Sequence, residues 1–206
     1  MENNNGPKGI KAILLGESGV GKTNLINVAI GSPFDDNSNT TYCNSFVEKY
    51  FEINNKKYLL NIWDTIGQEQ FRPLTRIFFK DSKIVIFVYD KSLRKSFEEL
   101  NYWISEVKKL LGNDIIIAIV GNKADLDESD EDVDENEARQ FAISMNAKFK
   151  MTSAKMNGKG FISFLKELLI DYINKSNGNT NNENNGIVID TESHRKTKKN
   201  KKDKCC

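Results

Sequence analysis

The sequence has few cysteines, no long hydrophobic run and almost no net charge. Its three cysteines, two of which are the last residues printed, form no disulfide framework and are typical of a reducing compartment. No apolar run approaches the length of a transmembrane helix, and no secretory signal is expected at the N-terminus. The formal net charge of +1 gives no overall field that would attract a polyanion, so we expect no nucleic-acid partner.

A glycine-rich segment stands between a strand-like run and a helix-like run near the N-terminus. Residues 16–23 (GESGVGKT) fit the phosphate-loop pattern Gly-x4-Gly-Lys-[Ser/Thr]. Glycines allow successive backbone N–H groups to point inward, and the following helix N-terminus adds a partial positive charge. We expect Lys22 to reach the terminal phosphates and the Thr23 hydroxyl to bind Mg²⁺. The alternative is a glycine-rich turn that fits the pattern by chance.

Apolar strands alternate with amphipathic helices along most of the chain. Expected strands span residues 11–15, 46–53, 57–63, 84–89, 115–120 and 148–151, and expected helices span residues 22–30, 95–111, 135–145 and 161–174. The turn residues Asn54 and Asn55 predict an antiparallel hairpin, whereas strand–helix alternation predicts parallel strands covered on both faces. The expected fold is therefore α/β, of the phosphate-loop NTPase type, with a mostly parallel six-stranded sheet and one antiparallel edge hairpin. Its ligand should lie beyond the carboxyl ends of the strands.

Composition divides the chain into three parts. Residues 1–9 are polar and are expected to form a flexible N-terminus, and residues 10–175 carry the apolar pattern of one domain. Residues 176–206 are rich in Asn, Gly and Lys and are expected to form a disordered tail, because they offer too little apolar surface for a core.

A second motif follows the strand that ends at Trp63. In the run Asp64-Thr65-Ile66-Gly67-Gln68, Asp64 is expected to hold Mg²⁺ through water. The Gly67 N–H is expected to contact the γ-phosphate, and Gln68 to orient the attacking water. Taken alone, the run could be an exposed loop at the end of a strand.

A third motif, Asn122-Lys123-Ala124-Asp125, follows another apolar strand. The Asp125 carboxylate can accept hydrogen bonds from both guanine N1–H and the 2-amino group, a pair that adenine lacks, so unmatched bases are rejected. The Lys123 stem could cover the base, and in the weaker motif that includes Ser153 and Lys155 the N–H of Ala154 could meet the base carbonyl. The alternatives are a solvated turn or, for the whole protein, an ATP-using enzyme of the same fold.

Together these residues resemble the Ras superfamily of small GTPases and, within it, the Rab family. The resemblance covers residues 10–175 and the two terminal cysteines. Its Rab-like signatures are Asn61 to Thr65 with Gly67, Gln68 and Glu69, then Phe71-Arg72, Val88-Tyr89-Asp90, and Ser96-Phe97 leading to Trp103.

The resemblance implies a membrane-anchored switch that hydrolyses GTP to GDP and phosphate and regulates vesicle traffic. It implies that Thr41, with Thr40 as the competing choice, binds Mg²⁺ in the GTP state, and that Phe34 packs edge-on against guanine. The implied partners are an exchange factor, a GTPase-activating protein, a prenyl-binding extraction protein and effectors. The expected catalytic residues are Gln68, Lys22 and Gly67, and the expected metal ligands are Thr23, Thr41 and, through water, Asp64. The expected nucleotide-binding residues are Gly16, Glu17, Ser18, Gly19, Val20, Gly21, Lys22, Thr23, Asn24, Phe34, Thr41, Asp64, Gly67, Asn122, Lys123, Asp125, Ser153, Ala154 and Lys155.

Two positions depart from the family pattern. Thr41-Tyr42-Cys43 replaces the usual Thr-Ile-Gly, at the surface where regulators discriminate, so partner identity does not follow from the resemblance. Ile66 stands where the family has Ala, and its β-branched side chain could obstruct the alignment of Gly67 and Gln68. We expect slower intrinsic hydrolysis with nucleotide binding retained; the alternative function is a GTP-bound scaffold with little or no hydrolysis.

The C-terminal residues resemble the Rab-type double-cysteine end. That resemblance implies geranylgeranylation of Cys205 and Cys206, and two lipid chains anchor a protein stably. The basic run 195–202 precedes them and favours an anionic membrane, although it could also direct nuclear or nucleic-acid binding. Two unmodified thiols are the alternative for the cysteines. The expected location is the cytoplasmic face of an intracellular or plasma membrane, with a cytosolic pool of extracted protein.

Overall fold

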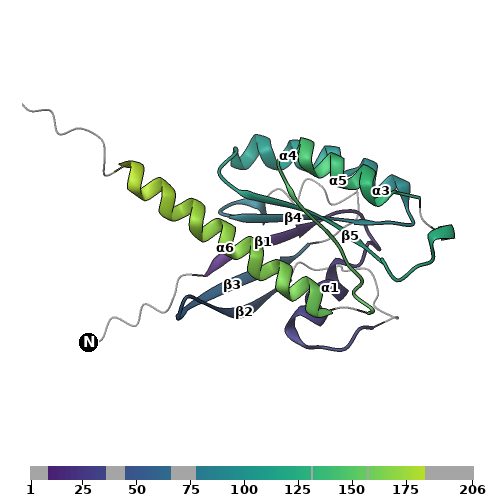
Figure 1. The fold of residues 1–206 in the computed structure, drawn as a ribbon, viewed down its shortest axis with the longest axis horizontal. Coiled ribbons are helices and arrows are strands. Elements are labelled where there is room, and N and C mark those ends of the chain that lie inside the picture. The colour runs from purple at the N-terminus through teal and green to yellow at the C-terminus, as the bar shows by residue number, and fades with distance from the viewer. Residues whose placement is uncertain (1–8, 36–44, 66–77, 131, 157, 184–206) are drawn as a thin grey trace, which may run out of the picture.

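A six-stranded sheet forms the centre of the computed structural model, which describes residues 9–35, 45–65, 78–130, 132–156 and 158–183 (Figure 1). Its strand order is β2-β3-β1-β4-β5-β6. The strands are β1 (Ile10–Leu15), β2 (Ser45–Ile53), β3 (Lys56–Asp64), β4 (Ile84–Asp90), β5 (Ile116–Asn122) and β6 (Lys148–Met151). All six lie within one or two residues of the positions expected from the sequence.

One pair of strands is antiparallel and the others are parallel. Strands β2 and β3 pair from Ser45 opposite Asp64 to Ile53 opposite Lys56. Asn54 and Asn55 between them have φ values of 50° and 60°, and two left-handed residues form a tight turn that follows the twist of a hairpin. The pairs β1–β3, β1–β4, β4–β5 and β5–β6 are parallel. The predicted edge hairpin and mostly parallel sheet are confirmed.

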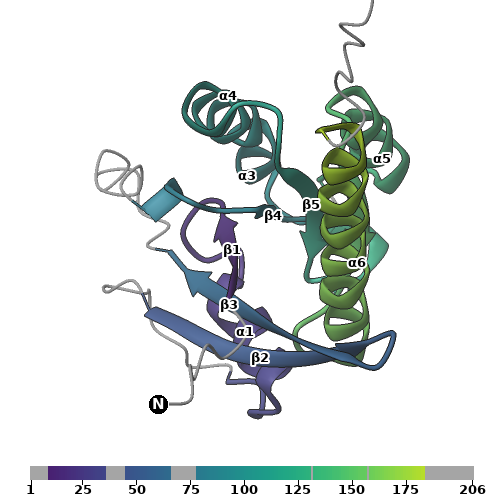
Figure 2. The ribbon, with the colours of Figure 1, turned by 90° about the vertical axis from the view of Figure 1, so that its left-hand side faces the viewer.

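Helices cover both faces of the sheet (Figures 1 and 2). They are α1 (Lys22–Ile30), α3 (Arg94–Glu98), α4 (Leu100–Leu111), α5 (Glu135–Ser144) and α6 (Gly158–Glu183), with a short 3₁₀ turn at Glu128–Asp130. Helices α1 and α6 lie on one face, and α3, α4 and α5 lie on the other.

The central strand β1 separates two hydrophobic clusters. Its side chains Ala12 and Leu14 join the cluster under α1 and α6, whereas Ile13 and Leu15 join the cluster under α4 and α5. All four are fully buried. Because successive side chains of a strand point to opposite faces, this continuous apolar run requires cover on both sides.

Two helices differ from the sequence-based expectation. The helix expected at residues 95–111 is divided at Glu99, whose φ and ψ of −66° and −14° remain helical, and the Trp103 N–H donates to the Glu99 carbonyl at 3.3 Å across the division. Helix α6 ends at Glu183, nine residues past the expected end at residue 174, and so includes residues 176–183 of the expected tail. Polar residues can prolong an existing helix, because each added residue gains a backbone hydrogen bond without a new nucleus.

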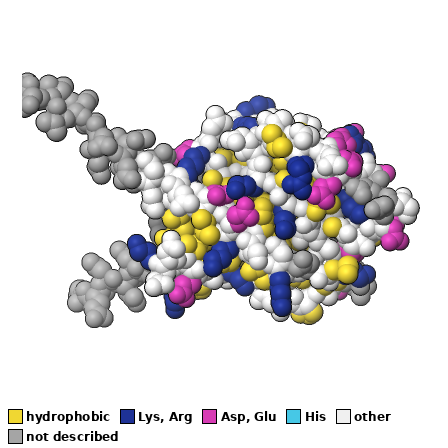
Figure 3. Space-filling view, viewed as in Figure 1, with side chains coloured by type: hydrophobic (Ala, Val, Ile, Leu, Met, Phe, Trp, Pro, Cys, Tyr) yellow, Lys and Arg dark blue, Asp and Glu magenta, His cyan; other side chains and the backbone are white. Residues whose placement is uncertain are grey.

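The outer surface mixes charges of both signs. On the face shown in Figure 3, Lys and Arg side chains lie among Asp and Glu side chains. No helix in the described ranges combines the length and the apolar character needed to cross a bilayer.

Candidate functional site

Polar residues gather beyond the carboxyl ends of the parallel strands. The phosphate-loop segment follows β1, Asp64 ends β3, and Asn122 ends β5. The segment that contains Ser153 and Ala154 follows β6. Because these strands are parallel, the predicted motifs reach one edge of the sheet from four separate parts of the sequence.

The phosphate-loop segment requires glycine at two positions where the backbone is left-handed and crowded. Gly16 has a φ of +149°, and a Cβ there would lie 2.1 Å from the carbonyl oxygen of Val88. Gly21, at the start of α1, has a φ of +91°, and its Cβ would lie 2.3 Å from Nδ2 of Asn122. The glycines therefore allow the segment to fold closely against β4 and the end of β5.

Lys22 lies across the phosphate-loop segment. Its Nζ donates to the carbonyl oxygens of Gly16 and Glu17 at 2.9 and 2.8 Å. Burial lowers the pKa of Lys22 to about 8, although the nearby carboxylates of Asp64 and Glu17 oppose this shift. A lysine held inside a loop of backbone amides provides a cation whose charge has little solvent around it, and an anionic ligand would stabilise its charged form.

Two oxygen-bearing side chains lie next to this lysine. The Thr23 Oγ1 donates to Oδ2 of Asp64 at 2.7 Å. The following residue, Thr65, is buried, and its Oγ1 donates to the carbonyl oxygen of Leu14 at 2.5 Å, so the end of β3 is attached to β1. A hydroxyl and a carboxylate at this spacing are the hard oxygen ligands that suit Mg²⁺. The residues present therefore fit the metal expected from the sequence.

Asn122 connects the phosphate-loop segment to the segment after β6. Its Nδ2 donates to the carbonyl oxygen of Val20 at 2.8 Å, and its Oδ1 accepts from the N–H of Ala154 at 3.2 Å. The side chain is buried, with both ends of its amide used. This one residue therefore sets the distance between the phosphate-loop segment and the segment expected to bind the base.

Lys123 and Asp125 are each held by a second side chain. The Lys123 Nζ lies 2.6 Å from Oδ2 of Asp90. The Ser153 Oγ donates to Oδ1 of Asp125 at 2.5 Å, which orients the carboxylate expected to select guanine. The N–H of Ala124 donates to the Thr152 carbonyl at 3.0 Å, and this backbone contact brings the two segments together.

The other predicted site residues differ in burial, and some of them lie outside the described ranges. Asn24 donates through Nδ2 to the Asp35 carbonyl at 3.1 Å, and Phe34 is partly buried against the cluster under α1 and α6. Val20 is buried, Ser18 is partly buried, and Gly19 and Lys155 are exposed. The predicted residues Thr41, Gly67, Gln68, Cys205 and Cys206, together with Thr40 and Ile66, lie outside the described residues.

Asp90 also lies among the candidate site residues, although the sequence indicated it only as part of a Rab-like signature. Besides the Lys123 ammonium, it accepts hydrogen bonds through Oδ1 from the N–H and Oγ of Ser92 at 2.9 and 2.8 Å. Sheet register places Asp90 directly beside Asn122. The sequence did contain a signal for Asp90, because Asp90 and Asn122 are both polar and both end apolar strands.

Comparisons with known proteins agree with this geometry. The Ras family model matches residues 11–172. Ras-related protein Rab-21 of Mus musculus is 44% identical over 161 residues, covering 78% of this chain and 70% of that protein. Ras-related protein Rab-2B of Dictyostelium discoideum is 40% identical over 145 residues, covering 70% of this chain and 71% of that protein. Rab-21 of the same organism is 37% identical over 182 residues, covering 88% and 81%.

These matches confirm the family and the fold expected from the sequence. Nothing in the geometry or the comparisons favours the alternative of a scaffold without hydrolysis. The chain belongs to the Ras family and, within it, to the Rab small GTPases, which bind and hydrolyse GTP and act in membrane traffic.

Proposed function

We propose that the residues beyond the strand ends bind a guanine nucleotide together with Mg²⁺ and so carry the GTPase activity. The observation that supports this most is the pair of Asn122 hydrogen bonds, 2.8 Å to Val20 and 3.2 Å to Ala154. They hold a phosphate-binding segment and a base-binding segment at one fixed separation, as a single nucleotide requires.

At the phosphate end, the backbone N–H groups of residues 16–23 and the Lys22 ammonium balance the negative charge of the phosphates. The contacts of Lys22 with the Gly16 and Glu17 carbonyls hold the cation inside the loop, where the negative charge of the phosphates would stabilise it. Thr23 and Asp64 would hold the metal, Asp64 through water, and a bound Mg²⁺ would neutralise charge that develops on the phosphate oxygens. Thr41 would complete the ligands in the GTP state.

Hydrolysis needs a water positioned in line with the terminal phosphate. Gln68 would orient this water, and the Gly67 N–H would contact the γ-phosphate. Hydrolysis removes the γ-phosphate and so releases the segments around Thr41 and Gly67, which is how such a switch changes state. An activating protein that supplies an arginine typically adds about 10³–10⁵ in rate.

At the base end, Asp125 would select guanine through two N–H groups. Xanthine carries a carbonyl oxygen where guanine carries the 2-amino group, so Asp125→Asn should replace an acceptor by a donor that suits xanthine. We expect the variant to lose most of its GTP affinity and to gain affinity for xanthosine triphosphate, measured by competition against a fluorescent nucleotide. Asp130→Asn, in the exposed 3₁₀ turn, is the control. An unchanged base preference of the Asp125 variant would refute this assignment.

An exposed aromatic surface next to β3 suits the expected regulators and effectors. Phe46 is 50% exposed and stacks on Trp63 with ring centroids 5.0 Å apart. Phe78 lies 6.0 Å from Trp63 and directly follows residues 66–77 in sequence, so a partner that contacts these rings also contacts the neighbours of the switch residues. Exchange factors, activating proteins and effectors are the partners expected there.

The C-terminal cysteines would supply the membrane anchor. Prenylation of Cys205 and Cys206 next to the basic run 195–202 combines two lipid chains with a cationic segment. A fluorescent fusion with a free C-terminus should label one class of cytoplasmic membrane surface and show a cytosolic pool of protein extracted by a prenyl-binding partner. The variant with Cys205→Ser and Cys206→Ser should be uniformly cytosolic. Membrane labelling that survives both substitutions would contradict lipid anchoring.

A further inference from the structure

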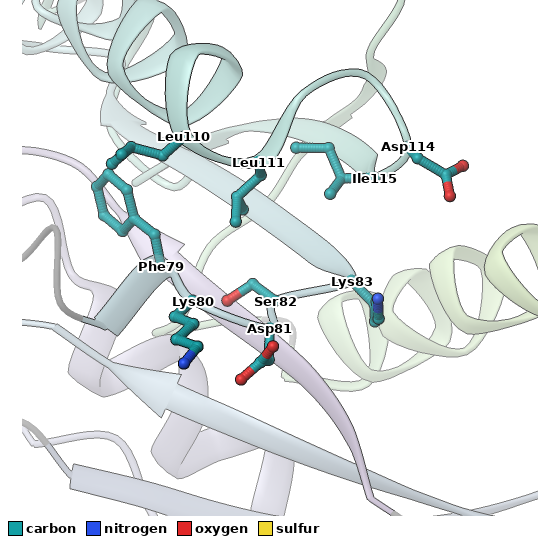
Figure 4. A pocket seen from close by; sticks show the side chains of 9 residues that line it. All are labelled: Phe79, Lys80, Asp81, Ser82, Lys83, Leu110, Leu111, Asp114 and Ile115. Carbon is teal, nitrogen blue, oxygen red and sulfur yellow. The ribbon is translucent and has the colours of Figure 1, made fainter.

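A cavity of about 510 Å³ lies at the opposite end of the sheet from the phosphate-loop segment. One wall is the segment 79–83, which leads into β4, and the other consists of the end of α4 and the connection to β5 (Figure 4). This volume is in the range of sites that bind small molecules or short peptide segments. The nucleotide residues follow the carboxyl ends of the strands, whereas this cavity precedes the amino ends of β4 and β5, so the two sites are separate.

Part of the cavity has an apolar lining, and polar or charged side chains form the rest of its wall. Phe79 and Ile115 are buried in its wall, and Leu110 is 53% exposed at its rim. Ser82 is only 2% exposed, and within the described chain its Oγ has no hydrogen-bond partner. A buried hydroxyl without a partner costs free energy, but this oxygen has almost no surface open to the cavity, so the apolar side chains and the charged rim are what an occupant would contact.

The rim carries charges of both signs, with the ammonium groups of Lys80 and Lys83 and the carboxylates of Asp81 and Asp114. Lys80 and Lys83 are exposed, and no contact of either ammonium group is found in the described parts of the chain. The nearby Asp114 carboxylate is already 3.1 Å from the Lys175 Nζ of α6. An occupant should therefore combine apolar side chains for the lining with a carboxylate for the lysines.

The chain itself contains such a segment. Residues 187–192 read Ile-Val-Ile-Asp-Thr-Glu, and they stand between a polar Asn-rich run and the basic run that begins at Arg195. Within residues 184–206 this is where aliphatic side chains stand next to acidic ones.

The segment is also within reach. The α6 residue Lys175 contacts the cavity wall through Asp114, and eight further residues bring the helix to its end at Glu183. Eight helical residues extend about 12 Å. The four residues 184–187 can extend back by up to about 14 Å. Ile187 can thus return to the level of Asp114 without any change in the domain.

We propose that residues 187–192 bind in this cavity of their own chain, with Ile187 and Ile189 against the apolar lining and Asp190 beside Lys80 and Lys83. In an extended segment, residues 187 and 189 share one side and Val188 faces the other. This contact would shorten the connection between the domain and the terminal cysteines.

Hydrogen–deuterium exchange on the full chain tests the contact. Amides of residues 79–83 and 110–115 should exchange about threefold or more slower in the native chain than in the variant Ile187→Ser with Ile189→Ser. Val188→Ser is the matched control and should retain the protection, because it removes the same kind of side chain from the opposite side. Equal exchange in all three proteins would overturn the proposal.

A charge exchange makes the test independent of any general effect of polar substitution. Asp190→Lys and Lys83→Glu should each reduce the protection, and the two together should restore it. The protection should not depend on protein concentration. Protection that grows with concentration would identify a second copy as the occupant and would also overturn the proposal, as would single charge variants that exchange like the native chain.

Discussion

Asp90 and Lys123 come from the ends of two neighbouring strands, and their charged groups lie 2.6 Å apart. Asp90 is nearly fully buried, and Ser92 donates two hydrogen bonds to its other oxygen. Lys123 has a φ of +63°, so its backbone is also held in an uncommon conformation. The position of the lysine expected to cover guanine is therefore set by a carboxylate that does not itself belong to the nucleotide motifs.

We expect Asp90→Asn to accelerate nucleotide release. The change removes the charge that holds Lys123 and should raise the GDP dissociation rate about tenfold, equivalent to about 1.4 kcal/mol. Release of a fluorescent GDP analogue measures this rate. The control is Glu137→Gln, which removes a carboxylate paired with Arg94 at 2.6 Å on the exposed surface and should leave the rate unchanged. Similar rates in both variants would contradict a positioning role for Asp90.

Alanine at two loop glycines should have different effects. In Gly16→Ala the new Cβ would lie 2.1 Å from a backbone oxygen, so we expect a loss of about 2–4 kcal/mol in stability and weak nucleotide binding. In Gly19→Ala the φ of +78° gives strain, but no described atom lies within 4 Å of the Cβ, so the loss should be about 1 kcal/mol. Denaturant unfolding of the two variants measures the difference. Equal losses would show that crowding by Val88 is unimportant.

Nucleotide affinity should fall as the pH rises above about 8. In the protein without ligand, burial lowers the pKa of Lys22 to about 8, and bound phosphates should raise it because they stabilise the charged ammonium. Binding then takes up a proton above pH 8, and the affinity decreases with pH, at most about tenfold per unit. GDP affinities measured between pH 7 and 9 test this.

The control for this pH dependence is Lys22→Arg, because a guanidinium keeps its charge over the whole range. This variant shares every other titrating group with the native protein, so the difference in slope isolates Lys22. Identical slopes in the two proteins would show that Lys22 does not lose its proton in the unliganded site.

Ile66 should slow the intrinsic reaction without weakening binding. We expect Ile66→Ala to hydrolyse GTP faster in a single turnover, because the smaller side chain leaves Gly67 and Gln68 free to align, and to keep the native GTP affinity. Equal single-turnover rates would end this hypothesis. A native protein with no measurable hydrolysis, even with an activating protein, would support the scaffold alternative.

The sequence predicted best those features that depend on consecutive residues. Helix α1 has the predicted bounds, because the phosphate-loop pattern and Gly31 define its two ends locally. The hairpin was predictable because two asparagines adopt the left-handed conformation that its turn requires. In both cases the signal lies within about ten residues.

Features that depend on sheet register or on helix propagation were not predictable in the same way. The contact between Asp90 and Lys123 arises because β4 and β5 pair with Asp90 beside Asn122, which no single motif encodes. The end of α6 was placed too early because its last residues are polar and show no apolar period. The Asp90–Lys123 contact thus depends on strand pairing, and the end of α6 depends on continuation of an existing helix. Neither is encoded in a local sequence pattern.

The central position of β1 has a consequence for how the nucleotide leaves. A strand hydrogen-bonded on both sides and covered on both faces opens only when most of the domain unfolds, so the phosphate-loop segment attached to it has a rigid base. Strand β6 is a four-residue strand at the margin of the sheet, and it carries the segment with Ser153 and Ala154. Separating this edge strand from the sheet requires far less free energy than opening β1. We therefore expect dissociation of the nucleotide to begin with loss of the contacts to the base. The contacts to the phosphates should be the last to break.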